Sequence, residues 1–363
     1  MLSRALITKT FRDLYRLRGQ VLSIGLVIAS GVALLLMSLS SLDSLRTTTD
    51  VYYERYRFAD VFATLKRAPE RVAERVADIE GVIMVESRIV RYAVVDIEGF
   101  VEPVMGRFVS VPIDAQPHLN QLVVQQGRLI APGNEDEVIV GRAFATAHGI
   151  VPGDTVTAIL NGNRRELDVV GIAQSPEHIY TLGPGALVPD ERRFGVLWMG
   201  RDALAAAFDL TDSFNDLTLQ LSRGTDPRSV IEELDIILAR YGGSGAIARA
   251  DQISNWFIMN EIAQRASLAA VLPVIFIVVS AFLTNMVMTR LIAIERPQIG
   301  LLKAFGYSDL QVAAHYLLFA LGIAAVGIVI GLTLGTWLGR YDTEQFASVV
   351  SFPFLVHRVN VGA

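Results

Sequence analysis

The chain has 363 residues, of which 52% are hydrophobic and 19% charged, and its mean hydropathy of +0.42 favours a membrane protein. The net charge is −5 and the basic residues are scattered, which argues against a nucleic-acid partner. The lack of cysteine excludes disulfides, thiolate metal sites and cysteine nucleophiles.

The N-terminal segment, residues 1–18, is basic and carries apolar residues at helical spacing. In a helix, one stripe would hold Ile7, Phe11, Leu14 and Tyr15. The pattern predicts a cytoplasmic amphipathic helix. Such a helix either lies on the membrane surface or forms an ordinary helical extension, and the spacing alone leaves both alternatives open.

Three uncharged apolar runs predict three transmembrane helices, at residues 19–42, 266–289 and 310–339. At a rise of about 1.5 Å per residue, each run is long enough to cross a hydrocarbon core of about 30 Å. A signal peptide is the alternative for the first run, but the apolar core is too long and no A-x-A-like cleavage site follows it. Pro273 lies near the start of the second run, where a membrane helix tolerates it.

The charges that flank these runs predict the orientation of the chain. Basic residues dominate residues 1–18, and Arg290, Arg296 and Lys303 occupy the short segment 290–309. By the positive-inside rule, both segments are cytoplasmic. We therefore predict a multi-pass protein of the plasma (inner) membrane. Its large segment 43–265 and its tail 340–363 then lie on the outer side.

Glycines recur at every fourth position of the third apolar run, at Gly327, Gly331, Gly335 and Gly339. On a helix they form one face, where the backbone of another helix can approach closely. A weaker repeat of small residues in the first run consists of Gly25, Ala29 and Ala33. We predict that the glycine face packs against another membrane helix. The alternative is that glycine is simply common in membrane helices.

The outer segment 43–265 is predicted to be an α/β domain. Residues 59–109 and 212–250 each have the pattern strand, helix, strand, with Pro69 and Pro227 placed to open the two helices. Between them, a β-rich insertion at about 121–199 contains one short helix from Gly141 to His148. The dipeptide Asn161-Gly162 predicts a tight hairpin in this insertion.

A series of short motifs runs through this insertion, namely Gly127-Arg128, Glu137-Val138, Gly141-Arg142-Ala143, Gly149, Gly153-Asp154-Thr155-Val156, Asn161-Gly162 and Val170-Gly171-Ile172. This series resembles the periplasmic core domain of MacB-like and FtsX-like ABC transporter permeases. The segment 295–308, ERPQIGLLKAFGYS, resembles the cytoplasmic coupling segment of the same family. Both lie where the predicted topology requires them.

The resemblance implies a permease that couples ATP hydrolysis to movement of its outer domain. It implies a porter-like subdomain with a β-rich insertion, a separate ABC-type ATPase, and a second permease domain in a homo- or heterodimer. An envelope adaptor and membrane lipid are further possible partners. The cargo would be a lipid, a lipoprotein, a peptide or a hydrophobic compound that is exported or extracted.

The coupling segment also has a pattern of its own. Ile299, Leu302 and Phe305 share one stripe of a short helix, which Gly306 ends. The resemblance places this stripe on the ATPase, whereas an interfacial helix lying on lipid is the alternative. The residues expected to couple to the ATPase are Glu295, Gln298, Ile299, Leu302, Lys303 and Phe305. Gln298 stands where the family commonly has an acid, which shifts the expected contact toward Glu295 and Lys303.

The chain departs from the family pattern at its end. It stops at SFPFLVHRVNVGA, where the fourth helix of the family should begin. Longer relatives carry a second copy of the whole arrangement. A natural short permease, a truncated gene and the front part of a duplicated permease are the alternatives.

The sequence contains no G-x-x-x-x-G-K-[ST] phosphate loop, and its five histidines lack the spacing of metal ligands. Glu135 and Glu137 flank a turn, and we interpret them as solvated side chains rather than an acid/base pair. We therefore predict no cofactor, no metal site and no enzymatic activity. A membrane-anchored regulator or sensor of an envelope partner, without transport, is the alternative to the permease.

Overall fold

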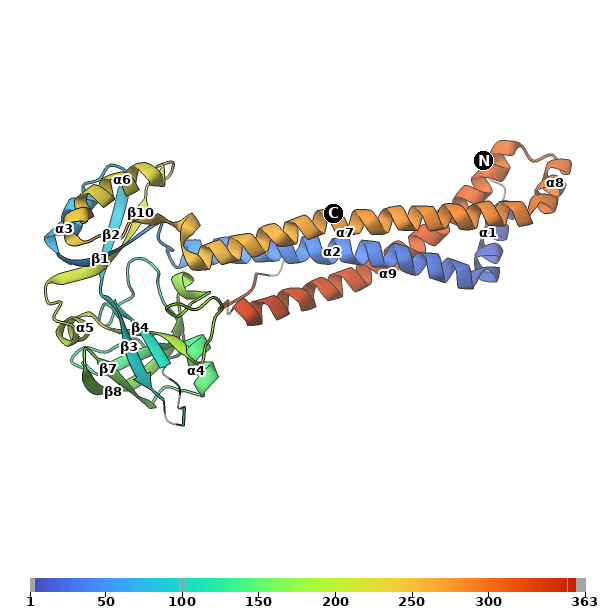
Figure 1. Cartoon of the computed structure of the whole chain (residues 1–363). Helices are drawn as coiled ribbons and strands as arrows, with labels where there is room; N and C mark the ends of the chain where they lie inside the picture. The colour runs from blue at the N-terminus through green and yellow to red at the C-terminus, as the bar shows by residue number, and fades with distance from the viewer. Residues whose placement is uncertain (1–3, 98, 101, 103, 351, 357–363) are drawn as a thin grey trace. The chain divides into compact units, whose positions relative to one another are not determined.

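The computed structural model describes residues 4–97, 99, 100, 102, 104–350 and 352–356, which form two compact units (Figure 1). The helical unit comprises Met1–Thr48, Glu261–Ala347 and Leu355–Ala363. The sheet unit comprises Thr49–Asn260 and Ser348–Phe354. Each unit is described here by itself.

The helical unit is built from helices alone in its described part. Its elements are α1 (Arg4–Arg16), α2 (Arg18–Arg55), α7 (Ile253–Ile294), α8 (Arg296–Ala304) and α9 (Asp309–Val350). Within the described residues, α2, α7 and α9 are the helices long and apolar enough to cross a membrane. These three carry the three predicted spans, and α1 coincides with the predicted N-terminal helix.

The three long helices extend well beyond the uncharged runs. Helix α2 continues from the predicted end at residue 42 to Arg55, and α7 begins at Ile253 instead of residue 266. Helix α9 continues past residue 339 to Val350. The polar sequence in these extensions contains neither glycine nor proline, so nothing in it breaks the helix. The first turns of α7 and the last turns of α2 consequently belong to the sheet unit.

The glycine face of α9 lies against α2. A Cβ atom added at Gly331 would lie 2.7 Å from the Cβ of Val32 and 2.8 Å from the carbonyl oxygen of Ala29. Gly327 approaches the carbonyl oxygen of Gly25 in the same way, and Gly335 approaches Ala33. The small residues of the two helices therefore face each other, and the backbones come close because no side chain separates them.

We expect Gly331→Leu to destabilise the helical unit strongly, because the backbone of Ala29 cannot move away from the added side chain. Val329→Leu serves as the matched control, since Val329 lies two residues away on α9 and is 62% exposed. Thermal unfolding of the two purified variants in one detergent should show a lower midpoint for Gly331→Leu alone. Equal midpoints would contradict this packing.

The smaller sheet of the sheet unit is formed by two interlocking β-α-β units. They consist of β1 (Val61–Pro69), α3 (Arg71–Ala77), β2 (Val82–Arg88), β10 (Ser213–Leu221), α6 (Pro227–Leu238) and β11 (Ile247–Ala248). The strand order is β11-β1-β10-β2, with each neighbouring pair antiparallel, so each unit is split by a strand of the other. Apolar residues of both helices and the strands share one core. The two predicted β-α-β units are thus confirmed.

The larger sheet contains seven strands in the order β5-β8-β6-β9-β4-β3-β7, and β7 also pairs with β8. This pairing closes the sheet on itself, because β8 is long enough to pair at both of its ends. The elements are β3 (Val90–Asp96), β4 (Val104–Val111), β5 (Val123–Gly127), β6 (Glu137–Gly141), α4 (Arg142–His148), β7 (Thr155–Leu160), β8 (Asn163–Gln174), β9 (Phe194–Gly200) and α5 (Arg201–Ala207). Short 3₁₀ turns follow at Pro176–His178, Ala239–Tyr241 and Arg249–Asp251.

The β-rich insertion is longer than the sequence indicated. It was expected at about 121–199, but the larger sheet begins at Val90. The apolar run VIMVESRIVRYAVVDI does form two strands, β2 and β3, which belong to different sheets. Alternating apolar residues predict a strand and do not say which partner it pairs with.

Two motif features of the insertion have a clear structural cause. Asn161 and Gly162 both have positive φ angles, of 50° and 86°, and connect β7 to β8 in the predicted hairpin. Gly127 has a φ of 76° and faces Gly171 across β5 and β8, where an added Cβ atom would lie 2.1 Å from the carbonyl oxygen of Val170. These positions require glycine for steric reasons.

Candidate functional site

Helix α8 connects α7 to α9 and is the predicted coupling segment. Pro297 lies in its first turn, where a missing N–H costs nothing, and Gly306 with a φ of 88° ends it. Ile299 and Leu302 are half-buried against an apolar cluster formed by the adjoining ends of α2, α7 and α9. These contacts hold α8 to the rest of the helical unit.

On the opposite side of α8, two large apolar side chains are not covered by any described residue. Leu301 is 59% exposed and Phe305 is 74% exposed, four residues apart on one face of the segment. Gln298 and Lys303 are also exposed, and the ammonium group of Lys303 pairs with the carboxylate of Asp309. The predicted stripe of Ile299, Leu302 and Phe305 is therefore divided, because Ile299 and Leu302 pack inward while Phe305 points away from the unit.

Glu295 is 8% exposed, although it was expected to contact a partner. Its carboxylate accepts a hydrogen bond from the Tyr316 hydroxyl at 2.9 Å and lies 3.3 Å from the Lys9 ammonium group. Thr10, the next residue of α1, is joined to His315 of α9 by a hydrogen bond of 2.9 Å. Glu295 thus ties α1 to α9 at the start of α8.

Of the four predicted stripe residues of α1, the structure describes the side chains of two. Leu14 packs against Gly322 of α9, whereas Tyr15 is 73% exposed. The side chains of Ile7 and Phe11 lie outside the described residues. Helix α1 therefore packs against α9 at Thr10 and Leu14, in addition to any contact with lipid.

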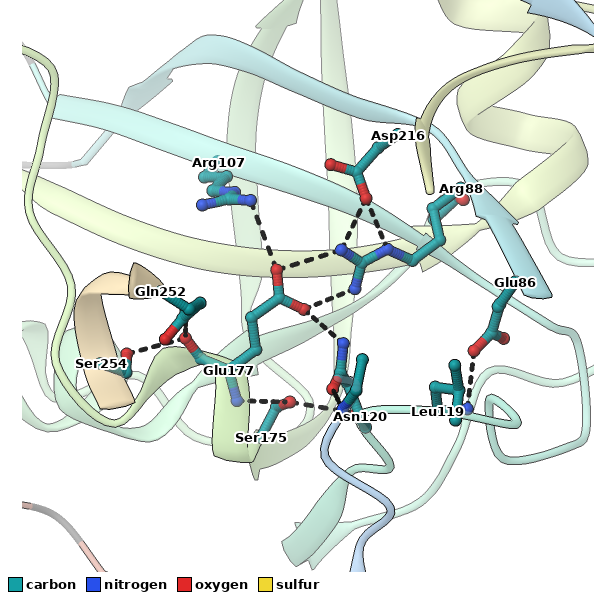
Figure 2. A network of polar contacts seen from close by, with 12 residues as sticks. Glu86, Arg88, Arg107, Leu119, Asn120, Ser175, Glu177, Asp216, Gln252 and Ser254 are labelled. Carbon is teal, nitrogen blue, oxygen red and sulfur yellow. Dashed lines mark hydrogen bonds and ion pairs between the residues drawn. The ribbon is translucent and has the colours of Figure 1, made fainter. Parts of the chain in front are cut away.

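A second group of ions is buried in the sheet unit, where its two sheets meet (Figure 2). The Arg88 guanidinium lies between two carboxylates, 2.5 Å from Glu177 and 2.6 Å from Asp216. Asn120 donates a hydrogen bond to Glu177 at 2.9 Å, and Arg107 lies 3.5 Å from the same carboxylate. Arg88, Glu177 and Asp216 are thus paired away from water, and the partly exposed Arg107 adds a second positive charge beside them.

The charges in this network shift one another's titration. Burial raises the pKa of Asp216, and the positive charge of Arg88, which lowers this pKa, does not fully offset the effect of burial. Burial acts in the same direction on Glu177, but Arg88, His178 and Arg107 outweigh it, so the pKa of Glu177 lies well below its usual range. Glu177 is therefore the permanent anion of the network.

The network also holds the beginning of α7. The backbone carbonyl of Glu177 accepts hydrogen bonds from Gln252 at 2.9 Å and from Ser254 at 2.8 Å (Figure 2). Arg88 is the last residue of β2, and Asp216 lies on β10. One buried cluster therefore connects the smaller sheet, the turn after β8 and the first residues of α7.

A further ion pair corrects the interpretation of Glu137. This residue is 6% exposed, and its carboxylate binds both terminal nitrogens of Arg128, at 2.6 and 2.8 Å. The hydrogen bond from Arg128, with those from the Ala131 backbone and the Asn134 amide, lowers the pKa of Glu137 to about 2. Glu137 is thus a structural anion that fastens the loop before β6, and Glu135 alone remains exposed.

Comparison with known proteins identifies the part of the chain that contains α8. Residues 270–361 match the family model described as FtsX-like permease C-terminal. This part of the chain is therefore similar to the C-terminal domain of FtsX-like permeases. The predicted resemblance to this family is thereby confirmed. The three predicted apolar helices and the predicted α/β fold class are present as well. None of the curated proteins matches the sequence.

Solved structures resemble the sheet unit at low similarity. The extracellular domain of the noncanonic ABC-type transporter YknZ from Gram-positive bacteria has 13% identity and a TM-score of 0.35, covering 52% of this chain and 98% of that one. The periplasmic region of MacB from Actinobacillus actinomycetemcomitans has 12% identity and a TM-score of 0.35, covering 56% and 95%. A domain of a permease protein from Porphyromonas gingivalis has 10% identity and a TM-score of 0.30, covering 53% and 90%.

Sequence reasoning missed two sets of residues, one on α8 and one in the sheet unit. Leu301 was not part of the predicted stripe. Its exposure depends on which side of α8 packs inward, and apolar spacing alone does not show that. The buried ions of the sheet unit had only a faint signal: Asp216 is the one charged residue of β10, and Arg88 follows another charged residue, Glu86, in β2. Their pairing joins positions 128 residues apart, which strand patterns do not reveal.

We expect Arg88→Met to destabilise the sheet unit by about 3–5 kcal/mol, because it leaves two buried carboxylates without their cation. For a unit of this size the midpoint of thermal unfolding should fall by about 10 °C. Arg193→Met is the matched control, since Arg193 forms an exposed ion pair with Glu102. Removing that pair should cost about 0–1 kcal/mol. Midpoints for Arg88→Met within about 2 °C of the parent would contradict the role of the network.

Proposed function

We propose that this chain is the permease subunit of an ABC transporter of the FtsX type, coupling ATP hydrolysis by a separate ATPase to movement of the sheet unit. The observation that carries the proposal is the division of α8 into two faces within the FtsX-like segment. Ile299 and Leu302 fix α8 to the long helices, while Leu301 and Phe305 stay available to a partner. A helix held in this way transmits a displacement instead of absorbing it.

The continuity of the long helices supports the same mechanism. Helices α2 and α7 each run without a break from the helical unit into the sheet unit. Tyr52 near the end of α2 and Ser254 at the start of α7 are both fully buried among residues of the sheet unit. A tilt or shift of either helix therefore reaches the sheet unit without an intervening flexible linker.

Residues on α8 then divide into two roles in the proposed coupling. Leu301, Lys303, Phe305 and Gln298 would contact the ATPase. Glu295, Ile299 and Leu302 would position α8, since their side chains are engaged within the chain. A second permease domain, in a homo- or heterodimer, or membrane lipid would cover the apolar surface of α7. Within this chain, 17% of the most apolar 18-residue stretch of α7 is buried.

Coupling is tested by substituting the exposed face of α8 in a complex with the cognate ATPase. Leu301→Ala and Phe305→Ala should each lower the permease-dependent stimulation of ATP hydrolysis by about tenfold, because each removes apolar contact area from the interface. Val329→Ala, exposed in the middle of α9, should leave the stimulation unchanged. The thermal midpoints of all three variants should equal that of the parent.

Full stimulation by both α8 variants would exclude this face as the coupling surface. Cargo movement must be followed beside ATP hydrolysis, because a membrane-anchored regulator would retain coupled hydrolysis without any flux. Lipid or lipoprotein release from proteoliposomes is the corresponding measurement. Coupled hydrolysis with no release of any cargo class would favour the regulator.

The proposed orientation places α8 in the cytoplasm and the sheet unit outside. The sequence lacks cysteine, so single substitutions can be labelled without a background. In intact cells, a membrane-impermeant maleimide should label Leu187→Cys, which replaces a residue that is 92% exposed in the sheet unit. Lys303→Cys should react only after the cells are permeabilised. Labelling of both variants in intact cells would contradict the orientation.

A further inference from the structure

The helical unit contains a pocket of about 130 Å³ at the α8 end of its long helices. Its walls come from the junction of α1 and α2, the last turns of α7 and the first turn of α8. Gln20 stands at the beginning of the uncharged run 19–42, and Arg290 directly follows the uncharged run 266–289. In a bilayer, the ends of such runs lie at the boundary between hydrocarbon and headgroups. The pocket is therefore at the level of the lipid headgroups.

Two arginines on the pocket wall have no partner in the chain. Arg16 is the last residue of α1, and Arg290 lies on α7. Both side chains are exposed, and neither forms a hydrogen bond or an ion pair with any described residue. A guanidinium group presents its N–H donors in a planar fork that matches the oxygens of a phosphate. Two such groups on one pocket favour an anion with several acceptor oxygens.

The acid on the wall does not cancel this charge. Glu295 is the only acid among the described residues that line the pocket. Its carboxylate lies 3.3 Å from the Lys9 ammonium group and accepts a hydrogen bond of 2.9 Å from the Tyr316 hydroxyl. The charges of Lys9 and Glu295 offset each other, so those of Arg16 and Arg290 remain in excess. Charge complementarity therefore selects an anionic occupant.

The remaining walls favour a lipid over a free phosphate ion. Leu17, Leu291 and Ile294 supply an apolar side, and Ile294 is 66% exposed. The glycerol backbone and first methylene groups of a lipid would cover these side chains, whereas a free ion would leave them in water. The volume is close to that of about four water molecules, which suits a phosphate group with its four oxygens. The headgroup thus enters the pocket while the acyl chains stay in the bilayer.

We propose that this pocket binds the phosphate headgroup of an anionic membrane lipid, held between Arg16 and Arg290. The bound phosphate joins the α1–α2 junction to the end of α7, directly before α8. The site needs the membrane spans but no ATPase. Lipid binding and the proposed coupling can therefore succeed or fail separately.

The test titrates the full chain in dodecyl maltoside, an uncharged detergent, with dioctanoylphosphatidylglycerol. Native mass spectrometry measures the fraction of chains that carry one lipid, and the parent should bind this lipid saturably. Arg16→Gln and Arg290→Gln should each weaken binding by about tenfold, the effect of one lost hydrogen bond to a charged group. Arg12→Gln and Arg296→Gln remove exposed arginines outside the pocket and should bind the lipid like the parent.

Two further probes distinguish the lipid phosphate from its alternatives. Dioctanoylglycerol has the same chains without the phosphate, so it should bind weakly and equally to the parent and all four variants. Inorganic phosphate should displace the lipid only at concentrations about tenfold or more above the Kd of the lipid, because it lacks the apolar contacts. Displacement at that Kd would overturn the proposal in favour of a free-phosphate site. Absence of saturable lipid binding in the parent, or equal weakening in pocket and control variants, would overturn it as well.

Another pair of variants fills the pocket without removing a charge. Gln20→Trp places a large ring in the pocket and should abolish saturable lipid binding, although both arginines remain. Leu22→Trp replaces a residue that is 53% exposed and outside the pocket, two positions along α2, and should bind normally. Without lipid, the thermal midpoints of all variants should equal that of the parent, because every replaced residue is exposed. Undiminished binding in Gln20→Trp would overturn the proposal, since the lipid would then bind elsewhere.

Discussion

The Arg88 guanidinium between Glu177 and Asp216 is the interaction on which the architecture of the sheet unit depends. Ionised groups enter a protein interior at a cost of several kcal/mol each, and the cost is offset only when the geometry pairs them closely. Here the pairing also decides which segments must meet. Arg88 and Asp216 belong to two strands of the smaller sheet. Glu177 belongs to the turn after β8, and its backbone binds the start of α7. Any separation of these segments would leave an uncompensated charge away from water.

The helical unit is organised by a different constraint, the close approach of two backbones. Between membrane helices the hydrophobic effect offers little discrimination, so packing is decided by how near the helices can come. Gly331 allows the carbonyl of Ala29 to lie where any side chain would collide, and the same contact recurs along the face. Polar contacts of Glu295, Tyr316 and Lys9 then fix the helices at the α8 end. The combination leaves α8 firmly supported on one side and uncovered on the other.

The local features of this chain followed from its sequence. Uncharged apolar runs located the three long helices, because a hydrocarbon core admits few other structures. Asn161-Gly162 specified its hairpin, since positive φ angles at two adjacent positions are readily adopted by these residues. Pro227 with Asp226 located the start of α6, where Asp226 accepts a hydrogen bond from the backbone of Arg228. These are consequences of the conformations that individual residues allow.

The tertiary structure alone decided which faces are covered and which charges are paired. Apolar spacing on α8 predicted a helix with a stripe, but whether Phe305 or Leu302 faces the bundle depends on the position of α2, α7 and α9 around it. Glu137 was expected to be solvated and Glu295 to contact a partner protein, but each forms an ion pair with a basic residue of the same chain. The insertion begins at Val90 because β3 and β4 find their partners far along the chain. Residue type and spacing determine local conformation, whereas burial and pairing depend on neighbours that only the folded chain brings together.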